Sequence, residues 1–141
     1  MNVVIDDRLL IEELLVGSRR PGVQLNTTVY WYYRACRAAV VGAGGHLSGP
    51  FRELEPQDQE RAISAMLQLP NDIGLPDTRQ LVPLMVEIAG RHPTLNLLNL
   101  EAVAAARALA ATIWLSPEAA NGVLPAVLDG ELLAWEIVIP K

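Results

Sequence analysis

The sequence predicts an α/β sandwich whose central sheet is mostly parallel. Apolar segments with strand character, at residues 2–6, 111–115 and 134–139, are separated by long segments with helical periodicity. Because parallel strands are joined by helical crossovers, this alternation favours helices on both faces of the sheet. We expect the strands that end near Asp6 and Leu115 to be neighbours, because apolar runs flanked by helices need burial on both faces. The chain has 141 residues, so we expect one domain over residues 1–141.

The predicted helices are bounded by the residue types that commonly start and end them, namely Thr, Asp and Ser caps, first-turn prolines and glycines. They cover residues 8–16, 28–41, 56–69, 77–90 and 96–110. Residues 42–50 are expected to form a loop, and residues 71–76 to hold a very short strand around Ile73. Ser116 and Pro117 start a last, short helix, which Gly122 and Pro125 make irregular.

Composition excludes several classes of protein. Hydrophobic residues make up 51% of the chain and charged residues 19%, which is typical of a folded domain. A net charge of −5 argues against broad electrostatic binding to nucleic acid. The single Cys36 excludes an internal disulfide, and the start turns acidic too early for a secretory signal, so we expect a cytoplasmic protein. No apolar run reaches the roughly 18 residues of a membrane span.

Three short motifs end or begin with an acid, at residues 3–6, 101–106 and 116–118. Together they resemble the PIN domain family, whose members typically open with an apolar strand ending in Asp, as Val3-Val4-Ile5-Asp6 does here. Residues 101–106 stand at the family's Asp-Ala-Leu-type helix start, with Glu101 for Asp, and Ser116-Pro117-Glu118 stands at its strand end Thr-x-Asp. The resemblance covers nearly the whole chain in order and length, and it implies a PIN-like three-layer α/β/α sandwich.

The resemblance also implies cleavage of single-stranded RNA that depends on Mg²⁺ or Mn²⁺. Asp6, Glu101 and Glu118 are then the catalytic residues and metal ligands, since carboxylate oxygens suit such ions and the ion activates a water. We expect the three to share one cleft, where crowding raises the pKa of one carboxyl. Each also has a simpler interpretation, as a helix cap or a first-turn acid.

The second predicted helix departs from the family pattern. Members usually place a Glu there, but residues 27–51 contain no acid, and Arg34 in that place is expected to pair with Asp6 and replace a metal by a salt bridge. The sequence therefore favours a degenerate PIN-like protein that binds RNA or a protein partner with weak or no nuclease activity. An active endoribonuclease of the toxin type and a structural homodimer are the alternatives.

Four of the seven aromatic residues are consecutive, at positions 30–33. On a helix they point in most directions, so at least one must be exposed or lie at an interface. We expect Trp31 or Tyr33 to bury against a second copy of the chain. The alternative is that bases stack there while Arg34 and Arg37 contact phosphates. The expected partners are thus a second copy, single-stranded RNA or an antitoxin-like protein.

Overall fold

The computed structural model describes residues 1–17, 20–41 and 53–139, and it has the predicted alternation of strands and helices. The predicted loop at residues 42–50 lies outside the described residues. In chain order the elements are β1 (Asn2–Ile5), α1 (Asp7–Leu15), β2 (Gln24–Asn26), α2 (Val29–Val41), α4 (Pro56–Leu67), α5 (Thr78–Arg91), α6 (Leu97–Leu109), β3 (Thr112–Leu115), α7 (Pro117–Ala120), α8 (Leu124–Gly130) and β4 (Trp135–Ile137).

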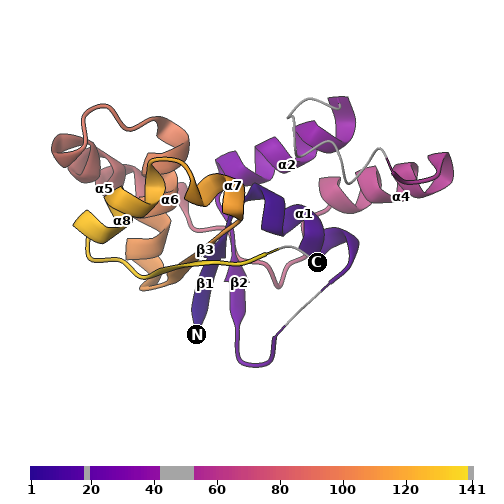
Figure 1. Ribbon diagram of the computed structural model, residues 1–141, viewed down its shortest axis with the longest axis horizontal. Coiled ribbons are helices and arrows are strands. Elements are labelled where there is room, and N and C mark those ends of the chain that lie inside the picture. Colours follow the sequence, from indigo (N-terminus) through magenta and orange to yellow (C-terminus); the bar gives the residue numbers. More distant parts are fainter. Residues whose placement is uncertain (18–19, 42–52, 140–141) are drawn as a thin grey trace.

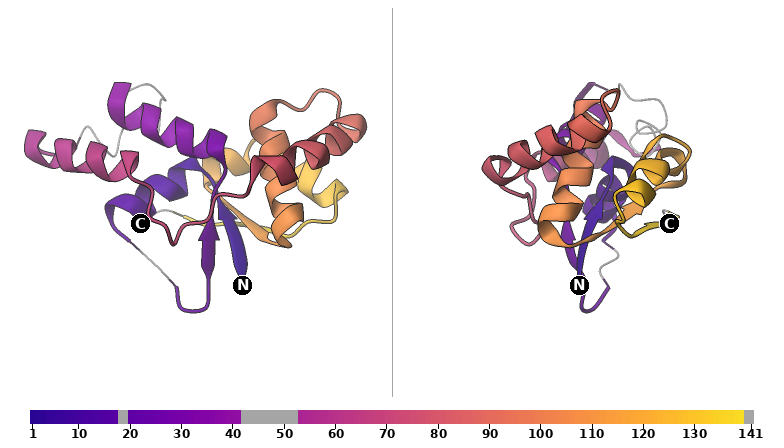
Figure 2. Two further views of the ribbon diagram at one scale, coloured as in Figure 1. Left: turned by 180° about the vertical axis from the view of Figure 1, so that it is seen from behind. Right: turned by 90° about the vertical axis from the view of Figure 1, so that its left-hand side faces the viewer.

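The four strands form one parallel sheet in the order β2-β1-β3-β4. Val4 lies opposite Asn26 on one side and Ile113 on the other, so β1 and β3 are neighbours, as the sequence predicts. The chain start and the turn before β2 lie together at one edge of the sheet (Figure 2), where the Met1 ammonium donates to the Gly22 carbonyl at 3.0 Å. The carboxyl ends of β1 and β3 lie side by side at the opposite end of the strands.

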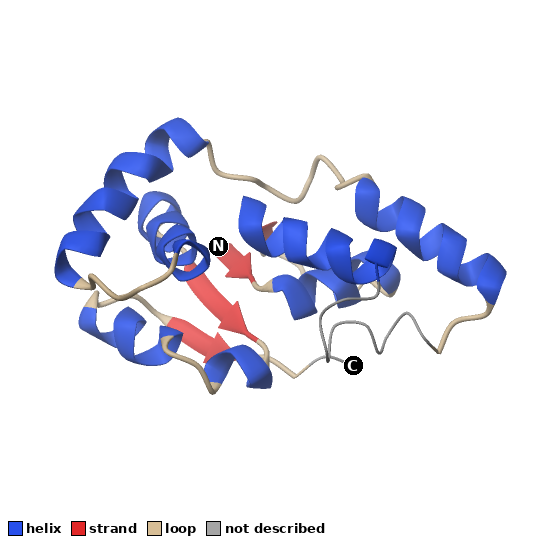
Figure 3. Cartoon of the chain, turned by 90° about the horizontal axis from the view of Figure 1, so that it is seen from above, coloured by secondary structure: helices blue, strands red, loops and turns tan. Residues whose placement is uncertain are grey.

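Helices cover both faces of the sheet, with α5, α6 and α8 on one side and α1, α2 and α4 on the other (Figure 1). Figure 3 separates the two groups of helices when the sheet is viewed from above. Successive strand residues face opposite layers. Val4, Ile113 and Leu115 pack in the core under α5, α6 and α8, whereas Val3, Ile5 and Trp114 pack in the core under α1, α2 and α4. The predicted three-layer sandwich is confirmed.

Two short elements differ from the prediction. The strand β2 is not predicted from the sequence, and in place of the predicted strand around Ile73 the structure has a single bridge between Asn26 and Gly74. The Gly74 amide donates to the Leu25 carbonyl, and the Gly74 carbonyl accepts from the Thr27 amide, both at 2.9 Å. A Cβ on Gly74 would lie 2.1 Å from Asn26 Oδ1, so only glycine fits this close approach.

The segment after Ser116 also differs in detail. It holds two short helices, α7 and α8, rather than one irregular helix, and Gly122 lies between them. Each begins near a proline that fits the first helical turn, Pro117 and Pro125. Within the described residues, no helix is long and apolar enough to cross a membrane.

Candidate functional site

Asp6 joins the carboxyl ends of β1 and β3. Its side chain is fully buried, and its Oδ1 accepts the Leu9 amide at 2.9 Å, which caps α1. Its Oδ2 accepts two hydrogen bonds from Ser116, from the amide at 2.8 Å and from the hydroxyl at 2.6 Å. Both oxygens of this carboxylate are therefore used to hold the two strand ends and the first helix together.

Burial raises the pKa of Asp6 above its ordinary value of 3.8, and the hydrogen bonds from Leu9 and Ser116 oppose that shift. The charge of Asp7 adds only the smallest contribution. The sequence predicts a raised pKa at this edge from crowding of carboxylates. The direction agrees for Asp6, but the main cause is loss of hydration.

Asp7, and not Asp6, is the partner of Arg34. Arg34 Nε lies 3.0 Å from Asp7 Oδ2, and the Asp7 side chain is almost completely buried while that of Arg34 is half-exposed. The expected Arg34–Asp6 pair is wrong for a geometric reason. As the N-cap of α1, Asp6 turns back toward the Leu9 amide and Ser116, whereas Asp7 in the first turn carries its carboxylate to α2.

Asp7 and Arg34 line a pocket of about 270 Å³ at the end of the strands, together with Ser116, Glu118 and Asn99. We call this the edge pocket. Glu118 is exposed in the first turn of α7. Of the three predicted metal ligands, it is the one that lines this pocket.

Glu101 lies elsewhere, in α6. It is nearly buried, and its Oε1 accepts the Tyr30 amide at 2.8 Å, which satisfies a free amide at the start of α2. Its side chain lines a separate groove between α2, α5 and α6. The expectation that Asp6, Glu101 and Glu118 share one cleft is therefore wrong. Asp6 is buried in the core, Glu101 lines the groove between α2, α5 and α6, and Glu118 lines the edge pocket.

The residues present do not fit the Mg²⁺ or Mn²⁺ site that the resemblance to PIN domains implies. Among the described residues, no group of three or more His, Cys, Asp or Glu side chains converges on one point. Both oxygens of Asp6 are engaged, and the edge pocket already contains the guanidinium of Arg34 beside its buried carboxylate partner. A divalent cation there would meet a fixed positive charge.

Helix α2 places its aromatic residues on two sides. Trp31 is only 2% exposed and packs in the core, so its ring is not free to bury against a second copy. Tyr33, Arg34 and Arg37 are on the outer side. The prediction for Trp31 is wrong because the side of α2 at positions 31, 35 and 38 is buried against the rest of the chain, while positions 33, 34 and 37 face outward.

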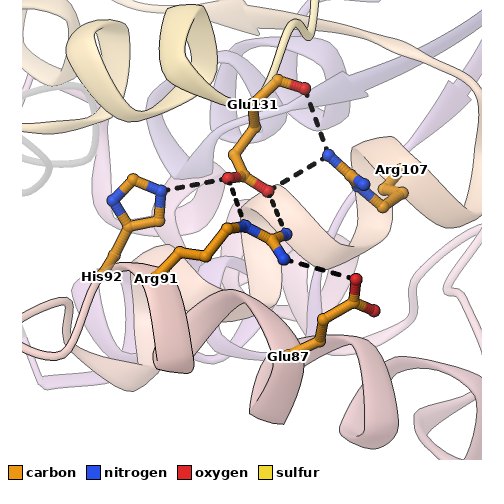
Figure 4. A network of polar contacts seen from close by, with 5 residues as sticks. All are labelled: Glu87, Arg91, His92, Arg107 and Glu131. Atoms are coloured by element: carbon orange, nitrogen blue, oxygen red, sulfur yellow. Dashed lines mark hydrogen bonds and ion pairs between the residues drawn. The ribbon is translucent and has the colours of Figure 1, made fainter.

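A second polar cluster, which is not predicted from the sequence, lies near the ends of the helices that precede β3 and β4. The nearly buried Glu131 carboxylate accepts from Arg91 Nη2 at 2.5 Å, from Arg91 Nε at 2.9 Å and from Arg107 Nη2 at 3.1 Å (Figure 4). His92 Nε2 lies 3.1 Å from Glu131 Oε2. These residues come from three separate parts of the sequence. Only Arg91 and His92, which are adjacent at the end of α5, form a local pattern from which part of the cluster could have been predicted.

Comparison with known proteins supports the fold. No protein-family model matches the sequence, and no curated protein matches it. One chain of VapBC-1 from nontypeable Haemophilus influenzae, a PIN-domain toxin–antitoxin complex, has a similar structure with a TM-score of 0.59. The match covers 97% of this chain and 98% of that chain at 14% sequence identity. The chain therefore has the PIN-like fold that its three motifs predict.

Proposed function

We propose that this chain is a PIN-like RNA-binding domain that does not cleave RNA by metal-dependent chemistry. The observation that carries the proposal is the Arg34–Asp7 ion pair, 3.0 Å long, at the pocket where the strand ends meet. PIN domains usually place a Glu on the second helix, and we take Arg34 to stand at that place. Here that place holds a permanent cation whose charge opposes that of a metal ion.

The outer face of α2 supports RNA as the ligand. Tyr33, Arg34 and Arg37 lie there, and residues three and four apart on a helix are neighbours. An aromatic ring beside two guanidinium groups suits a single strand, because bases stack on the ring and phosphates pair with the cations. With a net charge of −5 on the whole chain, binding depends on this one face.

The second candidate is a small protein partner of the antitoxin kind. It is favoured by the likeness over 97% of the chain to a protein whose structure was solved as a toxin–antitoxin complex. The same likeness motivates the third candidate, an active ribonuclease of the toxin type with Asp6, Glu101 and Glu118 as catalytic residues. The separation of these three side chains argues against it.

Fluorescence anisotropy with a labelled single-stranded RNA tests the proposal. We expect Tyr33→Ala to weaken binding by about 1–3 kcal/mol, the usual contribution of one stacked base. Arg37→Ala should weaken it as well. Arg61→Ala is the matched control, because Arg61 is an exposed arginine on a different helix, α4, and its loss should leave binding unchanged.

The same RNA, incubated with Mn²⁺ or Mg²⁺ and then with a chelator, tests for cleavage. We expect no cleavage that depends on the metal. Cleavage that is lost on chelation and in Glu118→Gln would establish the nuclease alternative. Absence of RNA binding by the parent chain would leave the protein partner as the better candidate.

A further inference from the structure

A pocket of about 340 Å³ lies on the side of the sheet that α1 covers, and it shares no lining residue with the edge pocket. We call it the α1 pocket. Its volume falls within the range of small-molecule sites, roughly 300–1,000 Å³. Its walls come from α1, from the segment that leads into β2, from β3 and from the residues after β4. The apolar part of the lining is formed by Ile5, Leu9, Val23, Leu25, Val138 and Ile139.

The indole NH of Trp114 has no acceptor within the described part of the chain. Trp114 is 7% exposed and lines the α1 pocket, and its Nε1 is buried without a hydrogen-bond partner among those residues. The indole of Trp135, by comparison, donates to Asp129 at 2.8 Å. Buried donors are rarely left unsatisfied in folded proteins, because they have lost their bonds to water. The Trp114 NH therefore indicates an acceptor on a bound molecule.

Arg20 brings further donors to the same pocket. Its guanidinium carbon lies 4.8 Å from the centre of the Trp114 ring, and Arg20 also lines the α1 pocket. The Arg20 side chain makes no hydrogen bond or ion pair within residues 1–17, 20–41 and 53–139. A guanidinium group pairs with a carboxylate through two parallel N–H donors. The guanidinium and the indole NH together therefore suit a carboxylate on the bound molecule.

Two carboxylates of α1, those of Glu12 and Glu13, line the pocket as well. Glu13 is nearly buried, at 9% exposed. A simple anion would be repelled by these two charges, whereas a molecule that also carries a cation is attracted to both kinds of group. Because a carboxylate accepts several hydrogen bonds, an ammonium group can pair with them beside the contacts that they already make. The lining thus suits a zwitterion with an apolar body.

We infer that the α1 pocket binds a free α-amino acid with an apolar side chain. The carboxylate of the amino acid accepts hydrogen bonds from Arg20 and from Trp114 Nε1, and its ammonium group donates to the glutamates of α1. Its side chain packs against the apolar part of the lining. The inference does not rest on RNA binding, because none of the outer residues of α2 lines this pocket.

Nuclear magnetic resonance of the nitrogen-labelled full chain, titrated with L-leucine, tests the site. The chain has three tryptophans, so it gives three indole NH signals, and the signal that Trp114→Phe removes is that of Trp114. We expect leucine to shift this signal, because its NH gains an acceptor, and to leave the signals of Trp31 and Trp135 in place. A Trp114 signal that does not move at saturating leucine would overturn the inference, as would equal shifts of all three signals.

Calorimetric titration tests the class of ligand. Isocaproate is leucine without its ammonium group, and isoamylamine is leucine without its carboxylate, so we expect each to bind at least about tenfold more weakly than leucine. Arg20→Gln should weaken leucine binding about tenfold. Arg79→Gln is the matched control, because Arg79 is exposed on α5 and does not line the pocket, and it should bind leucine like the parent. Equal affinities for leucine and isocaproate would contradict the inference, and so would leucine binding that Arg20→Gln leaves unchanged.

Discussion

Asp6 shows how a carboxylate that resembles a catalytic residue is used to hold the structure together. It is fully buried, which disfavours its charged form, but three hydrogen bonds from Leu9 and Ser116 compensate for the lost water. Because its pKa in the folded state is raised above 3.8, folding favours the protonated form. The stability that this shift contributes is complete below pH 3.8 and is lost as the pH rises through the raised pKa.

Replacing Asp6 by Asn should lower the free energy of unfolding by about 1–3 kcal/mol, because the new amide nitrogen would face a donor at Ser116 and leave a buried polar group unsatisfied. Urea denaturation measures the change. Asp77→Asn is the control, since Asp77 is an exposed cap whose side chain accepts the Arg79 amide, and Asn caps a helix as well as Asp does. Equal effects at both positions would contradict the role assigned to Ser116.

The sequence predicts that Asp6 ends a strand next to the strand that ends at Leu115, but its pattern does not decide which of two adjacent acids meets Arg34. Asp6 and Asp7 are chemically alike and both suit a helix start. Their directions differ because only the first is the N-cap. That difference of one position determines that the Asp6 carboxylate is buried in the core and that the Asp7 carboxylate lines the edge pocket.

At the scale of elements, Glu131 ties three helices together. Glu131 is the C-cap of α8, and its main partner, Arg91, is the last residue of α5. Arg107 lies in the last turn of α6, and its guanidinium also donates to the Glu131 carbonyl at 3.1 Å (Figure 4). Hydrogen bonds from Arg91, followed by His92 and the charge of Arg107, lower the pKa of Glu131 from 4.5 to about 2. Since α6 precedes β3 and α8 precedes β4, the cluster fixes how the chain enters both strands.

Because folding lowers the pKa of Glu131, the free energy of unfolding depends on pH. The contribution of Glu131 is complete above pH 4.5, and it is lost as the pH falls from 4.5 through about 2. Allowing for solvent around the half-exposed Arg91, we expect it to be roughly 2 kcal/mol. Glu131→Gln should therefore be less stable than the parent at neutral pH and lose less stability on acidification. Urea denaturation between pH values of about 6 and about 2 measures both, and parallel curves for the two proteins would contradict this role.

Long elements are predictable because local pattern determines them. The helices α2, α5 and α6 each have an apolar side. Helix α5 begins at the predicted cap, Asp77, and α6 follows Asn96, where the predicted helix begins. The strand β2 escapes prediction because it has three residues and owes its extended form to pairing with β1 and to Gly74. Tertiary contacts far along the chain determine such a strand.

At the scale of the whole molecule, the sheet brings the predicted motifs to one edge without bringing their carboxylates together. The topology confirms that β1 and β3 end side by side, which the apolar runs of the sequence indicate. Glu101 stands on α6, however, and turns to the start of α2, where it satisfies an amide. Side-chain direction on a helix depends on its rotation against the sheet, which short motifs do not encode. The fold is therefore predictable, whereas the placement of the acids is not.

The change in the melting temperature of the whole molecule on adding Mn²⁺ distinguishes a lost metal site from a retained one. A ligand that binds only the folded state raises the melting temperature. Because Arg34 already neutralises Asp7, we expect Mn²⁺ to leave the melting temperature of the parent unchanged. Arg34→Glu would place a new carboxylate beside Asp7 and within the pocket that Glu118 lines, so this variant should melt lower and recover in Mn²⁺.

Thermal unfolding followed by circular dichroism, with and without Mn²⁺, measures this difference. A recovery of roughly 3 °C would correspond to about 1 kcal/mol for a chain of this size. Arg34→Gln is the matched control, because it also loses the ion pair but adds no carboxylate, and Mn²⁺ should not restore it. Stabilisation of the parent by Mn²⁺, abolished in Glu118→Gln, would show instead that the edge pocket binds metal in spite of Arg34.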